Sequence, residues 1–537
     1  MSMSRRSELR WAVSALSARC LTNSARWCAE LLVSCGEDGN ASADANGENG
    51  GLEVDGEQES DQYRLARLYV ESREYRRAAR YLSGGRLPKE RFLRWYAIYL
   101  AGEKQKEEAT LQNESSQVNS ELTMLRKELT SCRDAGELDA FGHYLLGIVL
   151  KALNLKKAAI DALCESVNKF PFHWGAWTEI VAMMEKSGEI DHTRLPDHWM
   201  KEFFLAHVAV EFQQRNESEH RYSKLEQVFP KSVYIRNQQA LALYNAREFD
   251  ESQAIFEQIV EDDPYRLEGI DTFSDILYVK ELRAELSSLA HNCVKIDKYR
   301  PETCCVIGNY LSLRNEHEKA VNYFMRALKL NRSYLSAWTL MGHEYVEMKN
   351  TSAAVEAYRN AVDINPRDYR AWYGLGQTYE LLCMPLYTLY YFRKAAALRP
   401  SDSRMWFALG NCYQELKRDD RAIACYERAA SCDHFLDPAG YVLLRLAVLY
   451  ERVGKPELAA ERYKELISRS EQEAGLGQSS EAHIYLAEYY FSREDYDQSL
   501  SHCEAILDLQ PSDEQRVFRA NVLLNKIVAK RSQQAGE

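Results

Sequence analysis

The residue types that most often do chemistry are present in this chain, but without the spacing that chemistry requires. The 537 residues include 13 cysteines and 12 histidines, with no CxxC pair, paired histidines, P-loop, nucleophile elbow or HExxH helix. His343, next to Gly342, could be taken for a catalytic base, but no nucleophile lies at a spacing that would pair with it within one helix. The pattern predicts no catalytic, cofactor or metal site, and cysteines that are small buried residues of a reducing compartment.

A 34-residue repeat is the main organising feature of the sequence. Gly308, Gly342, Gly376 and Gly410 are 34 residues apart, and tryptophan, tyrosine, alanine and aromatic positions recur in the same phase. This is the tetratricopeptide signature of a helix–turn–helix unit, and such units must stack to share a core. The sequence therefore predicts an all-α, right-handed superhelical solenoid.

Within one repeat, the spacing predicts which side chains pack. Trp338, Met341, Gly342 and Tyr345 are spaced i, i+3, i+4 and i+7, which places them on one face of a helix. We expect the glycines and alanines to lie where helices approach closely, and the aromatic residues to fill the gaps between repeats. These residues are predicted to form the core and not a site.

The chain divides by composition into five parts. An Arg- and Ser-rich start resembles a transit peptide, but Trp11, Leu16, Trp27 and Leu31 favour a helical hairpin. The acid-rich stretch that follows is predicted to be a disordered linker. A polar segment at 102–138 is predicted to be an exposed helix with an internal loop, and residues 267–300 form a degenerate repeat. The predicted parts are the hairpin 1–35, the linker 36–60, the N-terminal array 61–300, the C-terminal array 301–513, and a capping helix and tail 514–537.

The remaining face of each first helix is the candidate binding surface. Counting along each repeat, the positions that do not pack are expected to face a concave groove of amides, carboxylates and aromatic rings. Such a strip suits an extended peptide with an arginine, because a carboxylate accepts a guanidinium bidentately. For any one residue, an ordinary solvated helix face is the alternative. The candidate groove residues are Asn309, Thr339, His343, Glu347, Tyr373, Gln377, Glu380, Phe407, Asn411 and Gln414.

Charge and hydropathy limit the possible partners. The formal net charge of −12 argues against nucleic acid as the main partner and is compatible with basic peptide segments. No run of 18 apolar residues occurs, so no membrane-spanning helix is predicted.

Several longer runs of sequence are more specific than the repeat pattern. They are LTNSARWCAEL (21–31), FLRWYAIYLAGEK (92–104), ETCCVIGNY (302–310), AWTLMGHEYVEMKNTSAAVEAYR (337–359) and RDYRAWYGLGQTYE (367–380). These runs resemble the family of the eighth subunit of the anaphase-promoting complex.

The resemblance implies a non-catalytic scaffold subunit of a cullin-RING ubiquitin ligase of the cell cycle, in nucleus and cytoplasm. It implies a homodimer formed by the repeats before residue 300, contacts with other tetratricopeptide subunits, and a groove for the C box of a propeller-type coactivator. The alternative is a co-chaperone or adaptor that clamps a peptide tail. A clamp needs converging cations, whereas Arg370 and Arg404 are the main cations of this face.

Overall fold

The computed structural model is all α-helical wherever it describes the chain. It describes residues 5–35, 60–111, 119–185, 188–189, 192–432, 440–472, 479–508 and 514–534. Within these ranges it has α-helices, one short 3-10 helix and no strand, so the predicted all-α solenoid is confirmed. The chain divides into two compact units, residues 1–266 and 267–537. The division falls one repeat earlier than the boundary at residue 300 that the sequence suggested.

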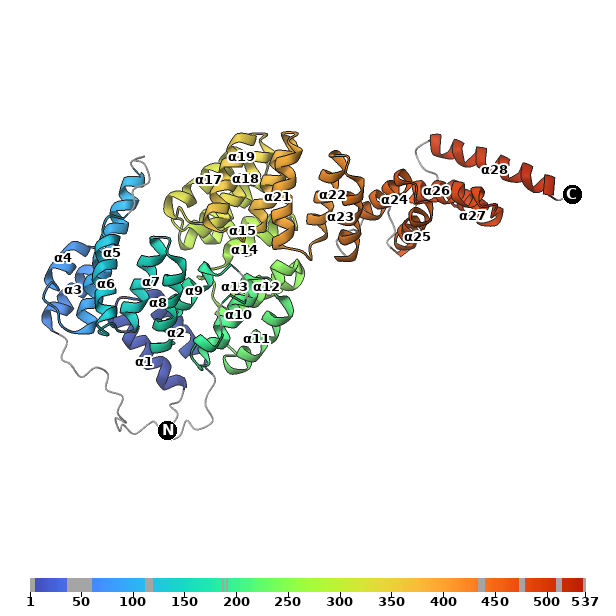
Figure 1. Ribbon diagram of the computed structural model, residues 1–537. Coiled ribbons are helices and arrows are strands. Elements are labelled where there is room, and N and C mark those ends of the chain that lie inside the picture. The colour runs from blue at the N-terminus through green and yellow to red at the C-terminus, as the bar shows by residue number, and fades with distance from the viewer. Residues whose placement is uncertain are drawn as a thin grey trace. The chain divides into compact units, whose positions relative to one another are not determined.

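Unit 1 opens with the predicted hairpin and continues as helix pairs (Figure 1). The predicted linker 36–60 lies outside the described residues except for Ser60, whose hydroxyl caps the next helix. Segment 102–138, predicted as an exposed helix with an internal loop, contains the end of one helix and the whole of the next, Leu122–Asp134, and residues 112–118 between them lie outside the described residues. The second helix is not simply exposed, because its Leu122, Leu125 and Leu129 are buried. The helices of unit 1 are α1 (Arg5–Ala18), α2 (Thr22–Ser34), α3 (Asp61–Glu71), α4 (Tyr75–Tyr81), α5 (Pro88–Leu111), α6 (Leu122–Asp134), α7 (Ala140–Ala152), α8 (Lys156–Lys169), α9 (Trp174–Met183), η1 (His192–Arg194), α10 (Met200–Glu211), α11 (Arg215–Val228), α12 (Val233–Ala246) and α13 (Phe249–Asp262).

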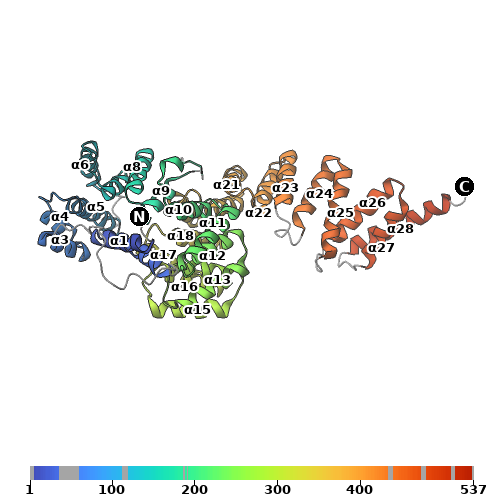
Figure 2. The same cartoon turned by 90° about the horizontal axis from the view of Figure 1, so that it is seen from below.

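Unit 2 is a continuous series of helix pairs that follow one another in chain order (Figure 1; Figure 2). The last helix occupies the predicted capping position, where Leu523 and Ile527 pack against Ala487 and Cys503. The helices of unit 2 are α14 (Ile270–Val279), α15 (Arg283–Ile296), α16 (Pro301–Leu313), α17 (His317–Leu330), α18 (Leu335–Glu347), α19 (Thr351–Ile364), α20 (Tyr369–Leu381), α21 (Pro385–Leu398), α22 (Ser403–Glu415), α23 (Asp419–Cys432), α24 (Tyr441–Val453), α25 (Pro456–Gln472), α26 (Ser479–Ser492), α27 (Tyr496–Asp508) and α28 (Glu514–Gln534).

The turn inside each repeat shows that residues 267–300 are not degenerate. In each turn, one residue adopts a left-handed conformation, and the following N–H bonds to a carbonyl five residues earlier, as in a Schellman cap. Glu281 holds this position in α14–α15, with φ 56°, in phase with its neighbours. Seven such residues are spaced by 34: Gln213, Arg247, Glu281, Asn315, Lys349, Cys383 and Lys417.

The repeated glycines lie where the two helices of a repeat touch. A Cβ on Gly376 would lie 2.3 Å from ring carbons of Phe392, and Gly308 has the same relation to Phe324. Both phenylalanines are fully buried. The close approach predicted from the small residues is therefore confirmed.

The repeated tryptophans have a second role besides the packing that was expected of them. Trp338, Trp372 and Trp406 are only partly buried. Each indole N–H donates to a backbone carbonyl six residues earlier, at 2.9, 2.8 and 2.9 Å. The tryptophans thus fasten the turn that joins one repeat to the next, in addition to packing.

A buried histidine in unit 1 predicts a pH-dependent stability. His173 is 1% exposed, its ring lies 4.1 Å from that of Tyr144, and burial lowers its pKa to about 3. In the unfolded chain the imidazole of His173 takes up a proton near pH 6.5, whereas in the folded chain it stays neutral. Its contribution to the free energy of unfolding is therefore complete above pH 6.5 and declines as the pH falls toward 3. Because of this group, we expect the free energy of unfolding of unit 1 to fall by about 1 kcal/mol between pH 7 and pH 5.5.

The measurement is hydrogen–deuterium exchange of α7 and α9 in the full chain at both pH values. His173→Phe should remove that part of the pH dependence, whereas His220→Gln, at an exposed position, should leave it in place. An unchanged pH dependence in His173→Phe would contradict the assignment.

Candidate peptide-binding face

The ten candidate residues lie on the first helices of four successive repeats of unit 2. Asn309 is on α16, Thr339, His343 and Glu347 are on α18, and the others are on α20 and α22. We call the surface formed by α14, α16, α18, α20 and α22 the A-helix face. Equivalent side chains recur every 34 residues because the turns keep the same phase. The helices therefore present these residues in rows.

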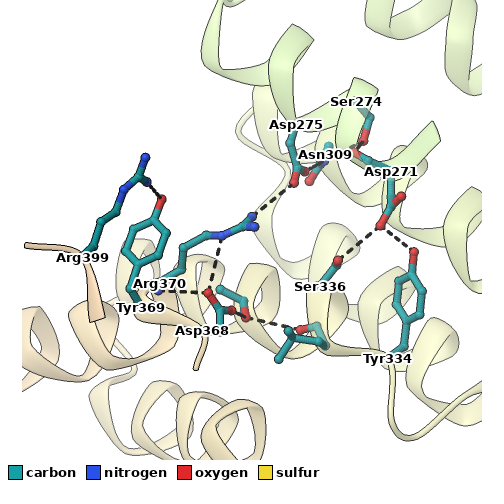
Figure 3. Close-up of polar contacts among 12 residues, drawn as sticks. Asp271, Ser274, Asp275, Asn309, Tyr334, Ser336, Asp368, Tyr369, Arg370 and Arg399 are labelled. Atoms are coloured by element: carbon teal, nitrogen blue, oxygen red, sulfur yellow. Dashed lines mark hydrogen bonds and ion pairs between the residues drawn. The ribbon is translucent and has the colours of Figure 1, made fainter. Parts of the chain in front are cut away.

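The most polar part of this face begins one repeat earlier than the sequence suggested (Figure 3). Asn309 is 2% exposed, and its amide donates to Ser274 Oγ at 2.9 Å and to Asp275 Oδ1 at 2.7 Å. Asp271 Oδ2 accepts from the Tyr334 hydroxyl at 2.7 Å and from Ser336 Oγ at 3.2 Å. These bonds join α14 to α16 and α18. The amide of Asn309 is therefore used within the protein and is not available to a ligand.

Sequence reasoning missed Asp271 and Asp275 because residues 267–300 were set aside as degenerate. A signal was available, since Asp275 lies 34 residues before Asn309, and the series continues with His343, Gln377 and Asn411. Extending the phase by one repeat would have placed both carboxylates on the A-helix face.

An arginine of the chain itself is held between carboxylates on this face (Figure 3). The Arg370 guanidinium lies 3.6 Å from Asp368 Oδ1 through Nε and 4.0 Å from Asp275 Oδ2 through Nη1. Asp368 also caps α20 by accepting from the backbone N–H of Arg370. The contact spans from α20 back to α14, so this face brings together groups from four successive first helices.

The second cation expected on this face is also paired. Arg404 lies one repeat after Arg370, and its Nη2 donates to Asp402 Oδ2 at 2.7 Å. Arg399 donates to the Tyr369 hydroxyl at 2.6 Å, with its guanidinium over that ring (Figure 3). The cations that a clamp for an acidic tail would use are therefore paired with groups of the chain.

His343 shares a hydrogen bond with a tyrosine of its own repeat and is not placed to act as a base. Its Nδ1 lies 2.8 Å from the hydroxyl of Tyr358. Part of the His343 side chain is exposed at the surface. Protein atoms crowd around the imidazole and desolvate it, and the nearby Arg370 repels a second positive charge, so the pKa of His343 is lowered to about 4. The ring is therefore neutral near pH 7, with its Nδ1 engaged by the tyrosine hydroxyl.

Five candidate residues pack or bond within the array. Thr339 is 5% exposed, and its Oγ1 lies 3.5 Å from Asp368 Oδ2. The rings of Tyr373 and Phe407 lie 5.3 and 5.7 Å from Phe392 and Tyr426. Asn411 and Gln414 both accept from the Tyr426 hydroxyl, at 2.6 and 3.2 Å. These side chains shape the face, and their outer edges border it.

Three candidates leave polar groups at the surface. Glu347 is exposed, and Gln377 and Glu380 are half-buried. Partial burial, with nearby Glu415, raises the pKa of Glu380. A cation arriving beside Glu380 would relieve both effects, which makes this carboxylate a suitable acceptor.

A buried carboxylate next to Glu347 was also missed. Glu344 is 4% exposed and accepts from Ser312 Oγ at 2.7 Å, and its Oε2 lies 2.8 Å from His317 Nδ1. It links α18 to both helices of the preceding repeat. Its spacing of three from Met341 and seven from Ala337, which places it on the same side of the helix as these buried residues, was the available signal.

The described residues hold no group of three or more side chains suited to a metal ion. None of the helices described is long and apolar enough to cross a membrane. All 13 cysteines are free, and most are buried as expected, but Cys383 is exposed and Cys20, Cys132 and Cys432 are half-buried.

Stacked helix pairs with a recurring polar face define a tetratricopeptide-repeat protein, and repeat models match residues 301–334, 342–382, 403–434 and 444–514. The family model "Anaphase promoting complex subunit 8 / Cdc23" matches residues 4–240. Anaphase-promoting complex subunit 8 of Arabidopsis thaliana is 46% identical, covering 95% of this chain and 94% of the relative. The Dictyostelium discoideum subunit 8 is 45% identical over 84% of this chain and 85% of its own.

The chain therefore belongs to the family of anaphase-promoting complex subunit 8, and it is a non-catalytic tetratricopeptide scaffold. A chain in the crystal structure of the APC/C hetero-tetramer Cut9-Hcn1 has the same fold, with a TM-score of 0.57 and 16% identity over 98% of this chain and 96% of that one. Family membership favours the scaffold over the co-chaperone alternative.

Proposed function

We propose that this protein is a scaffold subunit of the anaphase-promoting complex, acting as part of a cullin-RING ubiquitin ligase in the nucleus and cytoplasm. Its A-helix face, within residues 301–434 and the adjoining α14, binds the arginine-bearing C box of a propeller-type coactivator. Other tetratricopeptide subunits of the complex contact the same chain, and the repeats before residue 300 form a homodimer.

One observation supports the arginine site above the others. The A-helix face already holds a guanidinium, that of Arg370, between carboxylates from two helices. Arginine pairs bidentately with such groups, and truncating one partner of a desolvated pair costs roughly 2–5 kcal/mol. Glu347 and Glu380 are the two carboxylates among the candidate residues, and no ion pair is found for either within the described residues, so they are available to a second guanidinium.

The test is the affinity of the full chain for a fluorescent peptide that carries arginine and aromatic residues. Glu347→Ala combined with Glu380→Ala should weaken binding by about 2 kcal/mol, roughly thirtyfold, because both carboxylates are partly solvated. The helical circular dichroism should stay unchanged, since neither residue is in the core.

The matched control removes two carboxylates from the second helix of the repeat that contains Glu347. Glu356→Ala with Asp363→Ala makes the same charge change at exposed positions of α19 and should alter binding less than twofold. Equal binding by wild type and the Glu347/Glu380 variant would show that the face or the partner is wrong.

The homodimer has its own test. Isologous pairing is the commonest symmetry of homo-oligomers. Sedimentation of the full chain at micromolar concentration should give twice the chain mass of 62.0 kDa. A single-chain mass under these conditions would contradict the dimer without affecting the arginine site.

A further inference from the structure

A cavity of about 510 Å³ opens between α21 and α23, on the second helices of two neighbouring repeats. Its floor is formed by Trp406, Leu409 and Tyr413 of α22. Trp406, Leu409 and Tyr413 are spaced i, i+3 and i+7 on one face of α22, whereas Phe407, Asn411 and Gln414 are spaced i, i+4 and i+7 on another, so the cavity is separate from the A-helix face. Its lining is apolar apart from Arg393 and Arg421.

The repeat register explains why this cavity exists. Ala424 and Cys425 of α23 stand where the preceding repeat has Tyr390 and Tyr391. Tyr391 fills the equivalent space there, because its ring stacks on Tyr379 at 5.2 Å and lies 6.0 Å from Trp372. Trp406 and Tyr413 keep the floor that Trp372 and Tyr379 form one repeat earlier, but Ala424 and Cys425 place no aromatic ring over it.

The opposite wall is also built of small residues. Ala396 of α21 replaces Val362 of α19, and both walls therefore recede at the same level. The preceding repeat has the same floor and fills the space above it with tyrosines, so the repeat fold does not require an open space at this place. The cavity thus comes from the residues chosen at these positions and not from the fold.

The rim is positive in a chain whose net charge is −12. Arg393 and Arg421 are exposed, and neither makes an ion pair within the part of the chain that the structure describes. The guanidinium of Arg421 lies 5.9 Å from the centre of the Tyr413 ring, and that of Arg428 lies 5.3 Å from the Trp406 ring. The position of Arg421 is held by Tyr387 one repeat earlier, so the repeat does not require a cation there.

We propose that this cavity binds an acidic segment of a partner protein. An aromatic or long aliphatic side chain of that segment enters between α21 and α23, and carboxylates on either side of it pair with Arg393 and Arg421. A buried apolar anchor with charged groups at the rim is the usual arrangement of a tight interface, and arginine fits carboxylates bidentately. The apolar floor and the cationic rim together select this chemistry over a basic or a purely polar segment.

The probe is a fluorescein-labelled peptide with one phenylalanine between pairs of glutamates, titrated against the full chain. The same peptide with lysines in place of the glutamates should bind about tenfold more weakly or worse. Ala424→Tyr with Cys425→Tyr restores the residues of the preceding repeat, so it should fold, fill the cavity and reduce binding by about tenfold. Arg393→Glu with Arg421→Glu should cause a loss of at least that size.

The matched control is Lys329→Glu with Lys349→Glu, which makes the same charge change at exposed positions two repeats earlier. It should alter binding less than twofold. The proposal is overturned if the acidic peptide does not bind saturably up to millimolar concentration, or if filling the cavity leaves its binding unchanged. It is also overturned if filling the cavity abolishes self-association of the chain while no peptide binds, since the occupant would then be a second copy. Binding of the arginine peptide to the A-helix face should be the same in all these variants.

Discussion

Replacing Trp27 by alanine is expected to destabilise unit 1 by about 3–5 kcal/mol, the range for a large aromatic side chain removed from a core. Trp27 of α2 is 8% exposed and stacks on Trp174 of α9 with ring centres 4.6 Å apart. Phe203 and Tyr234 meet it edge-on at 5.4 and 5.6 Å. Its removal therefore takes away the centre of an aromatic cluster that holds the N-terminal hairpin on the repeats.

The readout is hydrogen–deuterium exchange, since repeat arrays need not unfold in one cooperative step. Amides of α2 and α9 should exchange faster in Trp27→Ala, while those of unit 2 stay unchanged. Val33→Ala in the same helix is the control, because Val33 is 84% exposed and should change stability by less than about 0.5 kcal/mol. Similar protection in the two variants would mean that the hairpin is held by other contacts.

Alanine at Gly376 and alanine at Phe392 are each expected to destabilise unit 2, but together they should cost less than their sum. A Cβ on Gly376 would lie 2.3 Å from the ring of the fully buried Phe392, which costs about 1–3 kcal/mol as overpacking. Phe392→Ala leaves a cavity and costs about 3–5 kcal/mol. In the double variant the new methyl group enters the space left by the ring, so the clash disappears.

The cycle is measured by exchange protection of α20 and α21 in the full chain. Gly84→Ala serves as the control for the substitution itself, because no atom lies within 4 Å of a Cβ built there. Strict additivity of the two changes would refute the direct contact between the glycine and the ring.

The arginine site shows where reasoning from the pattern succeeded and where it stopped. The repeat phase placed His343, Gln377 and Asn411 on the first helices of their repeats, as the structure has them. It could not tell which of these side chains the protein already uses for itself. Asn411 accepts from Tyr426, and Asn309 is buried against Asp275. Availability for a ligand depends on such partners, which are a full repeat away or on the second helix.

The two arginines of the same face show more clearly what the repeat pattern cannot predict. Arg370 and Arg404 were counted as cations of the face from their positions alone. Both are paired, Arg404 with the nearby Asp402, and Arg370 also with Asp275, a residue three repeats earlier. A contact of that span requires the curvature that accumulates over successive helix pairs, and no local pattern contains it.

The helices, their 34-residue phase and the small residues at the helix crossings can all be predicted from the amino-acid sequence. They follow from neighbours three, four or sixteen residues apart, so sterics and amphipathic spacing encode them locally. The family was predicted from the longer runs, such as residues 302–310 and 337–359. Only the tertiary structure decided that the hairpin docks through Trp27 on Trp174, that α14 contributes Asp271 and Asp275 to the A-helix face, and that a cavity opens beside Trp406. Each of these depends on how helices pack against one another in space, because the size of one side chain decides which residues its neighbour can contact.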